Sequence, residues 1–556
     1  MGRFVRGRRE FFILLAILVT AASLRLWQLG SASPPGLNQD EAVTIWNAQC
    51  LLKTGHDHSG FAWPTFYTRA FGDNPTTLFT YFLIPFEAIG GMSVLTARLA
   101  VAIAGIATVL LVAYIGTRMF GSATGLAAAA LLALSPWHVQ QSRWAADPAL
   151  TPFLVSLCWA ALLWARFPIA RDDADSPEPM RAALAGAIFG VSSYGYPSMR
   201  LFLPLFLAAI ALLARHRLAL VARSRRGAFA LFAFAGTWLA AFGPLVWRHA
   251  TDPEINKRAL TNWVWAATDS SAEKALAVVE RFLAHFNVSW LFVHSKMLDF
   301  IAPPAGGYLD WYVLPLLVAG VAAAALKARS AAPYRILLAA FVLYPVGDCL
   351  NSAESLHPLR SLAGLCGLVL TAAAGAIEAW RWFRARTPRA ATIAAAIFLA
   401  IAVASHVRGY RAFFGEFNDR PWTRAAFHVD LVEACEWLRP RLDRTDAVFC
   451  TAAGMNMPYV VAMVALGYDA RQWFRDERRT FLVDEWEYHS QVGKIYFMYV
   501  GHDDTHDAAW DALAANATED RVVVIARPGE ITLENPVHVI RDDEGEPRLL
   551  IYETTL

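Results

Sequence analysis

Long apolar runs alternate with short polar segments through the first three quarters of the chain. Runs near the length that crosses a bilayer as a helix, about 17 to 25 residues, recur eleven times. They lie at about 11–29, 93–117, 125–140, 149–166, 182–195, 199–214, 227–247, 310–327, 334–350, 359–380 and 390–407. This pattern predicts an α-helical polytopic membrane protein with about 11 transmembrane helices.

The placement of arginine predicts the orientation of these helices. Basic clusters fall at Arg3–Arg9, Arg215–Arg226 and Arg381–Arg389, whereas the opposite short loops carry isolated basic residues such as Arg143. Because short cytoplasmic loops carry an excess of Lys and Arg, we expect a cytoplasmic N-terminus. The first run has spanning length and no small-x-small cleavage site before Pro34, so we interpret it as an uncleaved first span.

Three long segments then lie outside the membrane. The segments at 30–92 and 248–309 carry the aromatic and helix-like stretches expected of helices in the membrane interface. After residue 407 charged residues rise and spans disappear. The predicted domains are a transmembrane domain over 1–407, with loops 30–92 and 248–309, and an extracytoplasmic α/β domain over 408–556.

Strands and helices alternate in the predicted α/β domain. Residues 446–451, 494–500, 521–526 and 548–554 have strand patterns, and residues 425–438 and 507–515 have helix patterns. No G-x-G-x-x-G motif follows a strand there, so dinucleotide binding is not supported.

Composition agrees with a membrane protein. The chain has 556 residues, of which 56% are hydrophobic and 17% charged, and its mean hydropathy is +0.36, more apolar than soluble domains are. Its six cysteines lack metal-ligand spacing. Cys435 and Cys450 lie in the soluble stretch and either pair or remain two free buried thiols, which is the favoured interpretation.

Two adjacent carboxylates, Asp40 and Glu41, follow the first predicted span and the turn at Pro34, Pro35 and Gly36. A membrane enzyme would keep a base at this place. Alternatively, the two acids merely start a helix, because acidic residues in a first turn complement the helix dipole. The local sequence leaves both interpretations open.

Further polar residues gather at the predicted outer ends of the spans. Ionisable groups near the hydrocarbon boundary cost free energy unless they are paired or hydrated, so such a ring favours a polar cavity. The alternative is that each arginine reaches lipid headgroups and each acid caps a helix. The residues are His138, Arg143 and Asp147 near the third and fourth spans, Tyr196 and Arg200 between the fifth and sixth, and His357 and Arg360 between the ninth and tenth.

Several short motifs carry a resemblance to a known family. They are N-Q-D-E-A (38–42), L-L-K-T-G-H-D (51–57), W-P (63–64), Y-F-L-I-P-F (81–86), A-R-L (97–99), L-S-P-W-H-V-Q-Q-S-R (134–143) and Y-G-Y-P-S-M-R-L-F-L-P (194–204). Together they resemble the membrane glycosyltransferases of the large C-type fold, which use polyprenyl-phosphate sugars. That group includes the protein O-mannosyltransferases and the lipid A aminoarabinose transferase. The resemblance covers most of residues 10–410, and the Asp-Glu pair is its most specific part.

The resemblance implies roles for individual residues. Asp40 would be the general base that deprotonates or orients an acceptor hydroxyl, because a hydroxyl is a weak nucleophile. Glu41 would support the site, Asp147 would be a second acid that shapes a substrate pocket, and inversion at C1 would follow. The lipid phosphate leaving group needs positive charge or dipoles at its oxygens. Candidates for binding the donor phosphate or substrate are Arg143, Arg200, Arg360, Tyr196, His357, His138 and Arg69. No metal and no other cofactor is expected.

The first outer loop departs from the family. Relatives of the aminoarabinose type carry Lys-Pro-Pro there, whereas this chain has Asp73-Asn74-Pro75-Thr76. Asn74 cannot supply the charge of that lysine, so either an arginine replaces it or the donor sits differently. His56, Asp57 and His58 lie too close in sequence for a convincing metal site, and a hydrated loop is the favoured interpretation.

The sequence therefore predicts an inverting glycosyltransferase of the bacterial inner membrane with a periplasmic active site. It would move a sugar from a polyprenyl-phosphate-linked donor to a hydroxyl acceptor on a protein, lipid A or another envelope glycan. We expect membrane lipids and no nucleic acid as further partners. The alternatives are a transporter or flippase, which should show broken or charged helices near the bilayer midplane and repeated halves, and a scaffold that displays the α/β domain.

Overall fold

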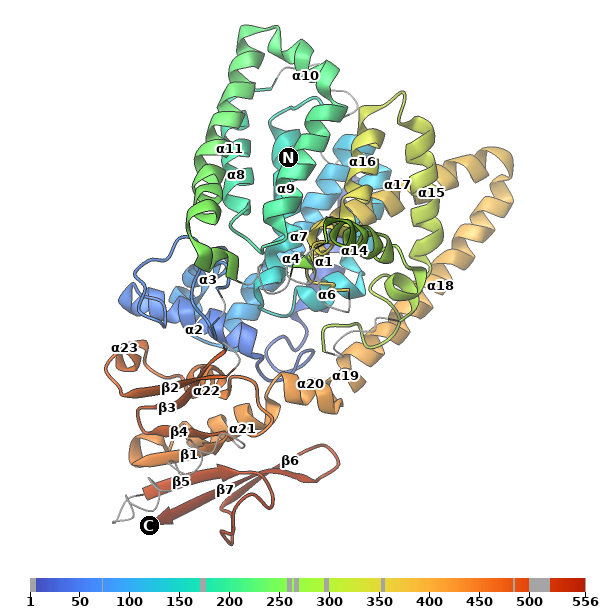
Figure 1. Cartoon of the computed structure of the whole chain (residues 1–556). Helices are drawn as coiled ribbons and strands as arrows, with labels where there is room; N and C mark the ends of the chain where they lie inside the picture. The colour runs from blue at the N-terminus through green and yellow to red at the C-terminus, as the bar shows by residue number, and fades with distance from the viewer. Residues whose placement is uncertain are drawn as a thin grey trace. The chain divides into compact units, whose positions relative to one another are not determined.

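The computed structural model describes residues 7–72, 74–170, 177–257, 263–264, 270–294, 300–351, 356–483, 486–499 and 521–555. The chain divides into two compact units (Figure 1). The helical unit comprises Met1–Trp27 and Val101–Phe413, and the α/β unit comprises Gln28–Ala100 and Phe414–Leu556.

The helical unit contains a helix in every one of the eleven predicted runs. Among the residues that the structure describes, five helices are long and apolar enough to cross a membrane, or six if the pair α9 and α10, bent by 77°, is one span. The number of eleven spans therefore stays a prediction. The helices are α1 (Arg8–Leu26), α4 (Val94–Phe120), α5 (Ser122–Ala133), α6 (Pro136–Gln141), α7 (Thr151–Trp164), α8 (Pro179–Ser192), α9 (Met199–Leu213), α10 (Arg215–Ala222), α11 (Arg225–Thr251), α14 (Ser271–Ala284), α15 (Val313–Lys327), α16 (Ala332–Val342), α17 (Leu365–Arg386) and α18 (Pro388–Phe414).

Small residues let the helices of this unit approach closely. Helix α8 packs along α11, and α15 packs along α17 (Figure 1). A Cβ on Gly320 of α15 would lie 2.0 Å from the carbonyl oxygen of Thr371, and a Cβ on Gly375 of α17 would lie 2.0 Å from that of Leu316. Backbone contact of this kind is typical of helices that pack inside a membrane.

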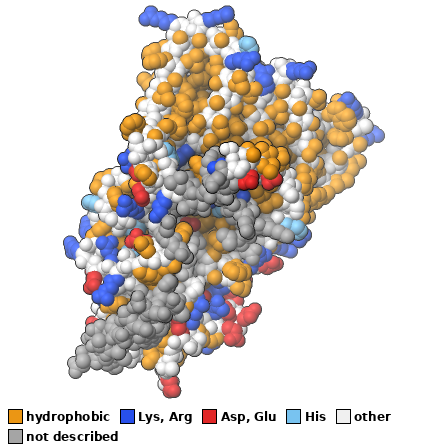
Figure 2. All heavy atoms as spheres, in the orientation of Figure 1, with side chains coloured by type: hydrophobic (Ala, Val, Ile, Leu, Met, Phe, Trp, Pro, Cys, Tyr) orange, Lys and Arg blue, Asp and Glu red, His pale blue; other side chains and the backbone are white. Residues whose placement is uncertain are grey.

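The surface of the helical unit is apolar. Figure 2 shows hydrophobic side chains over most of its visible face, with Lys and Arg gathered at the end that carries α10. Large exposed side chains on α11 include Phe229, Phe232, Leu239 and Trp247. An exposed apolar surface of this extent fits lipid rather than water. The chain is therefore a multi-pass membrane protein.

The α/β unit combines the first long segment with the C-terminal part of the chain. Its seven-stranded sheet has the order β2-β3-β4-β1-β5-β7-β6. Strand β1 pairs in parallel with β4 and β5, and the other pairs are antiparallel. The strands are β1 (Ala447–Thr451), β2 (Arg478–Val483), β3 (Trp486–Val492), β4 (Ile495–Met498), β5 (Arg521–Ala526), β6 (His538–Arg541) and β7 (Pro547–Thr555). The helices are α2 (Gln39–Thr54), α3 (Thr77–Gly90), α19 (Glu416–Asp419), α20 (Pro421–Ala426), α21 (Val429–Leu438), α22 (Pro458–Leu466) and α23 (Ala470–Trp473).

All four predicted strands are confirmed, as β1, β4, β5 and β7, and the helix predicted at 425–438 is confirmed mainly as α21. The helix predicted at 507–515 lies outside the described residues. Strands β2, β3 and β6 and helices α22 and α23 were not predicted. All six cysteines are free and buried, which confirms the favoured interpretation of Cys435 and Cys450.

Helix α2 joins the first segment to the C-terminal fold. It packs on α22 and α23, where the fully buried ring of Trp46 meets that of Trp473 at a centroid distance of 5.6 Å. Burial of two large aromatic rings is a strong contribution to a core. Residues 28–100 therefore fold with residues 414–556, while the predicted limits at 407 and 408 stay a prediction.

Candidate functional site

Asp40 and Glu41 lie in the first turn of α2. The Oδ1 atom of Asn38, the N-cap residue, accepts a hydrogen bond from the Asp40 N–H at 2.9 Å. The Glu41 carboxylate accepts one from the Asn38 N–H at 3.5 Å, which completes a capping box. The two acids thus do start a helix. Their surroundings differ, because Asp40 is exposed and Glu41 is fully buried.

Glu41 is bound by Arg98 at the beginning of α4. The guanidinium donates from Nε to Oε1 at 2.9 Å and from Nη2 to Oε2 at 2.8 Å, and neither side chain is exposed. Arg98 also donates to the carbonyls of Pro34 and Gly36 at 2.7 and 2.9 Å. A buried charge is destabilising unless it is paired and hydrogen-bonded, and the contacts of Glu41 and Arg98 meet both conditions. Glu41 therefore fixes the turn before Asp40, and Arg98, the arginine of the A-R-L motif, is a site residue that sequence reasoning did not name.

The helical unit brings Asp147 and Arg200 together. Arg200 lies in the first turn of α9 and interacts electrostatically with Asp147, which begins a short 3-10 helix (Asp147–Leu150). Arg200 Nη1 lies 3.0 Å from Nε2 of His249, and Nδ1 of His249 lies 2.7 Å from Oδ1 of Asn256. Because arginine can only donate, Nε2 accepts and Nδ1 carries the proton.

His249 is thus a neutral ring that orients Arg200. Sequence reasoning missed both His249 and Asn256. The available signal was the position of His249 at the end of an apolar run, which it shares with His138 and His357.

Asp348 organises the connection that carries His357 and Arg360. This carboxylate is 1% exposed. Its Oδ2 accepts from Arg281 Nη2 at 2.8 Å and from the His357 N–H at 2.9 Å, and His285 Nε2 lies 3.3 Å from it. Arg360 Nη1 lies 3.5 Å from Oδ1. Two arginines around one carboxylate leave a positive excess, which suits an anionic group.

Gly347 places the Arg200 and Arg360 connections side by side. A Cβ there would lie 2.1 Å from the carbonyl oxygen of Arg360 and 2.8 Å from Cβ of Ser198. Any side chain at residue 347 would push the two connections apart. The connections that carry Arg200 and Arg360 are therefore adjacent in the helical unit, and the ring of polar residues stays a prediction.

Arg143 and His138 face inward instead. Arg143 is fully buried and donates from Nη1 to the carbonyls of Leu24 and Arg25 at 3.1 and 3.0 Å, at the C-terminal end of α1. The guanidinium of Arg25 lies 2.7 Å from Nδ1 of His138. These contacts satisfy carbonyls that a helix end leaves unpaired. A phosphate-binding role for Arg143 and His138 stays a prediction.

The remaining candidates have separate surroundings. Tyr196 is buried, and its carbonyl accepts from the Met199 N–H at 2.9 Å. Arg69 is exposed, with its guanidinium 4.3 Å from the ring centroid of Phe61. Asp40, Glu41 and Arg69 belong to the α/β unit, and the other candidates belong to the helical unit. A single chamber that gathers all of them stays a prediction.

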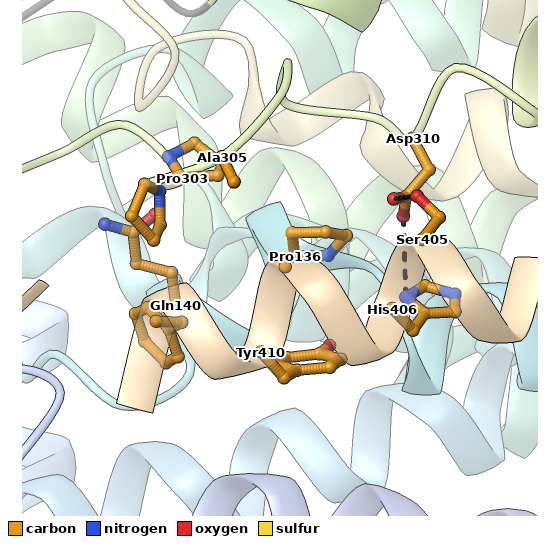
Figure 3. A pocket seen from close by; sticks show the side chains of 11 residues that line it. Pro136, Gln140, Pro303, Ala305, Asp310, Ser405, His406 and Tyr410 are labelled. Atoms are coloured by element: carbon orange, nitrogen blue, oxygen red, sulfur yellow. Dashed lines mark hydrogen bonds and ion pairs between the residues drawn. The ribbon is translucent and has the colours of Figure 1, made fainter. Parts of the chain in front are cut away.

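A small pocket that contains a few polar side chains was not predicted. It lies between α6, α18 and residues 303–310 (Figure 3). Oδ1 of Asp310 accepts from Ser405 Oγ at 2.8 Å, and its Oδ2 lies 3.6 Å from Nδ1 of His406. Nε2 of His406 lies 2.6 Å from the hydroxyl of Tyr312. These polar groups are paired with one another.

Among the described residues, no group of three or more His, Cys, Asp or Glu could hold a metal ion. Asp57 and His58 are buried, so the interpretation of this stretch as a hydrated loop is wrong for these two residues. Asp57 Oδ1 accepts from the N–H groups of Ser59 and Phe61, and His58 Nδ1 lies 2.8 Å from Oδ1 of Asn47. They build a compact turn.

Residues 73–240 match the family model described as dolichyl-phosphate-mannose-protein mannosyltransferase. The apo oligosaccharyltransferase of Archaeoglobus fulgidus superposes with a TM-score of 0.52 at 12% identity, over 94% of this chain and 70% of that chain. ArnT from Cupriavidus metallidurans in its apo state superposes with a TM-score of 0.50 at 14% identity, over 98% and 97%. The chain has the C-type membrane glycosyltransferase fold. The resemblance inferred from the short motifs is thereby confirmed. No curated protein matches the chain in sequence.

Proposed function

We propose that the protein is an inverting glycosyltransferase that moves a sugar from a polyprenyl-phosphate carrier to a hydroxyl acceptor at the periplasmic face of the bacterial inner membrane. The fold and the partial family match support this class. The observation that carries the proposal is the contrast between two adjacent acids. Glu41 is buried and bound by Arg98, whereas Asp40 is exposed on the rigid helix start that this pair holds.

Asp40 would act as the general base. Its carboxylate takes the proton of the acceptor hydroxyl while the hydroxyl oxygen forms a bond to C1 of the sugar. The bond between C1 and the phosphate oxygen breaks, and polyprenyl phosphate leaves with the electron pair. Attack from the face opposite to the leaving group inverts C1.

Arg200 and Arg360 would bind the leaving phosphate, with Arg281 beside them. Preorganised positive charge stabilises the oxygens on which negative charge develops. Asp348 lies 2.8 Å from Arg281 and 3.5 Å from Arg360, and Asp147 interacts electrostatically with Arg200. Arg200 would then replace the charge that Asn74 does not supply, and we propose that transfer needs no metal. This predicts that turnover persists after dialysis against EDTA, and loss of turnover that Mg²⁺ or Mn²⁺ restores would contradict it.

A transporter is less well supported. It should contain a broken helix near the bilayer midplane. The one bent pair among the described apolar helices, α9 and α10, bends where Arg215 and Arg217 follow Leu213. These arginines mark a predicted cytoplasmic end rather than a midplane.

The test is turnover by the purified full-length protein with polyprenyl-phosphate mannose as the first donor probe and envelope extract as acceptor. We expect Asp40→Asn to lower turnover by about 10²–10⁴-fold, the usual contribution of a general base, without weakening donor binding. Asp443→Asn removes another exposed acid of the α/β unit and serves as the control. Wild-type turnover by Asp40→Asn would refute the base assignment. Failure of the wild type to bind or consume any polyprenyl-phosphate sugar would refute the proposed glycosyltransferase activity.

A further inference from the structure

The residues before Asp40 pair with the segment that leads into the C-terminal sheet. The Leu37 N–H donates to the carbonyl of Phe427 at 2.6 Å, and Nδ2 of Asn38 donates to the carbonyl of Ala426 at 2.7 Å. Further back, the Ser33 N–H donates to Oδ1 of Asn418 at 2.6 Å. All of these residues belong to the α/β unit. The approach to α2 is therefore fixed by residues more than 380 positions later.

His428 makes the contact that lies nearest to the helix cap. It is 4% exposed and has a φ of 44° immediately before α21. Its Nδ1 lies 3.3 Å from the carbonyl oxygen of Leu37. His428 thus links the start of α21 to the peptide that precedes Asn38.

Gly36 allows the two segments to meet backbone to backbone. A Cβ at this position would lie 2.2 Å from the carbonyl oxygen of Phe427 and 3.1 Å from Cα of Val429. The φ of Gly36 is 51°, a left-handed conformation that a side chain disfavours. The fit leaves no room for the turn to shift toward residue 427.

We propose that His428 is a positioning residue for Asp40, through which the C-terminal domain becomes part of the catalytic machinery. This inference rests on the proposed function. The contacts run from His428, at the start of α21, to the Leu37 carbonyl, and from the adjoining Asn38 to the N–H of Asp40. A shift of a base by about 1 Å can lower a rate by about 10²-fold, so this support decides whether Asp40 meets the acceptor hydroxyl.

His428→Leu in the full-length protein tests the proposal. It keeps the approximate volume and removes the contact of the ring with the Leu37 carbonyl. We expect kcat to fall about 10²-fold with an unchanged KM for the polyprenyl-phosphate donor, because the donor phosphate is bound elsewhere. His428→Gln keeps a side-chain N–H for the Leu37 carbonyl and should restore most of the lost kcat. A residue that serves stability alone would show neither the split between kcat and KM nor the rescue.

His489→Leu is the matched control. His489 lies in the same unit, is 5% exposed and packs on Tyr459 and Trp473. Its loss should lower stability and leave kcat unchanged. A readout independent of activity is hydrogen exchange of the peptide that covers residues 33–45. The amides of Asp40 and Glu41 should exchange faster in His428→Leu and at the wild-type rate in His489→Leu.

The outcomes separate the two hypotheses when Asp40→Asn is assayed in parallel. An inactive Asp40→Asn beside a fully active His428→Leu would overturn the positioning role alone, as would an equal loss of kcat in His489→Leu. An active Asp40→Asn would overturn the base assignment on which the proposal rests. If His428→Leu does not fold, Asn418→Ala decides, because it removes the side chain that accepts from the Ser33 N–H and hydroxyl and that donates to the carbonyls of Phe414 and Gly415. Unchanged kcat and unchanged exchange at residues 33–45 in that variant would overturn the proposal.

Discussion

Two neighbouring carboxylates have different surroundings because adjacent residues of a helix point in different directions. Glu41 meets Arg98, 57 residues away, and Asp40 stays exposed. Local sequence cannot separate the two acids, since their partners lie outside any window that a pattern covers. The separation matters chemically, because the Glu41 carboxylate is bound to Arg98 inside the protein, whereas the Asp40 side chain is exposed.

The Glu41–Arg98 pair gives a prediction about stability. Glu41→Gln and Arg98→Met each leave one buried charge without its counterion, so each should lower the free energy of unfolding by about 3–5 kcal/mol. The double variant should lose less than the sum of the two, because neither charge remains. Thermal unfolding in detergent measures these changes. Glu477→Gln, in a pair exposed by 64% on both sides, is the control. A loss in Glu41→Gln no larger than in this control would contradict the prediction.

A second residue-scale prediction concerns Gly36. Gly36→Ala adds a methyl group 2.2 Å from the carbonyl oxygen of Phe427, in addition to the cost of a left-handed alanine, about 1 kcal/mol. Gly60→Ala measures the cost of the left-handed alanine alone, because Gly60 has a φ of 92° and no atom within 4 Å of its Cβ position. Thermal unfolding should show a clearly larger loss for Gly36→Ala. Equal losses would mean that the contact with residue 427 adds nothing.

At the scale of elements, the sequence predicts what a local pattern determines and misses what depends on contacts between distant residues. Long apolar runs determine their helices locally, and every predicted run contains one. Strands β2 and β3 were missed because Arg478, Arg479 and Glu487 interrupt their apolar alternation. The joining of residues 28–100 with 414–556 was not visible, because contacts such as Trp46 with Trp473 leave no local pattern.

The candidate site was predictable in part. The positions of Asp147, Arg200, His357 and Arg360 at span ends were sufficient to name them, since polar residues there stand out against an apolar background. Their partners were harder to find. Arg281 lies on an amphipathic helix that the pattern assigns to the membrane interface. Arg143 occupies a similar position in sequence to Arg200, yet it turns inward to the end of α1, a choice that packing alone decides.

The contact between α15 and α17 gives an element-scale prediction. Gly375→Val would place side-chain atoms where the backbone of α15 lies. The Cβ atom alone would lie 2.0 Å from the carbonyl oxygen of Leu316. Overpacking of this kind costs about 1–3 kcal/mol or more, so the unfolding temperature should fall. Gly236→Val on α11 is the control, because nothing lies within 4 Å of its Cβ position. Thermal unfolding followed by circular dichroism should show a lower unfolding temperature for Gly375→Val than for Gly236→Val. An equal decrease in both variants would indicate only the effect of valine on helix formation.

At the scale of the whole molecule, both units pair buried arginines with carbonyls or carboxylates, as Arg25 and Arg143 do in the helical unit and Arg98 does in the α/β unit. The α/β unit also buries His58, His428 and His489. Burial lowers the pKa of His58 and of His428 to about 4 and that of His489 to about 3. Neutral rings of this kind make the stability of one unit depend on pH.

The sign of that dependence follows from proton binding. Between pH 6.5 and 4 these histidines bind protons in the unfolded chain and not in the folded one, so the stability they provide is complete above pH 6.5 and falls as the pH drops. Each contributes up to about 1.4 kcal/mol per pH unit. Burial raises the pKa of Asp57 and raises that of Glu87, in the same unit, to about 9. These two acids bind protons more readily in the folded chain than in the unfolded one, so they offset part of the loss that the three histidines cause as the pH drops.

We therefore expect the α/β unit to unfold at a lower temperature at pH 4.5 than at pH 7. Hydrogen exchange of the peptides that contain His58, His428 and His489, corrected for the intrinsic rate at each pH, reports on this unit separately from the helical unit. These peptides should lose protection at a lower temperature at pH 4.5 than at pH 7. His56→Gln, at an exposed histidine, should leave the shift unchanged. Equal unfolding temperatures at the two pH values would contradict the prediction.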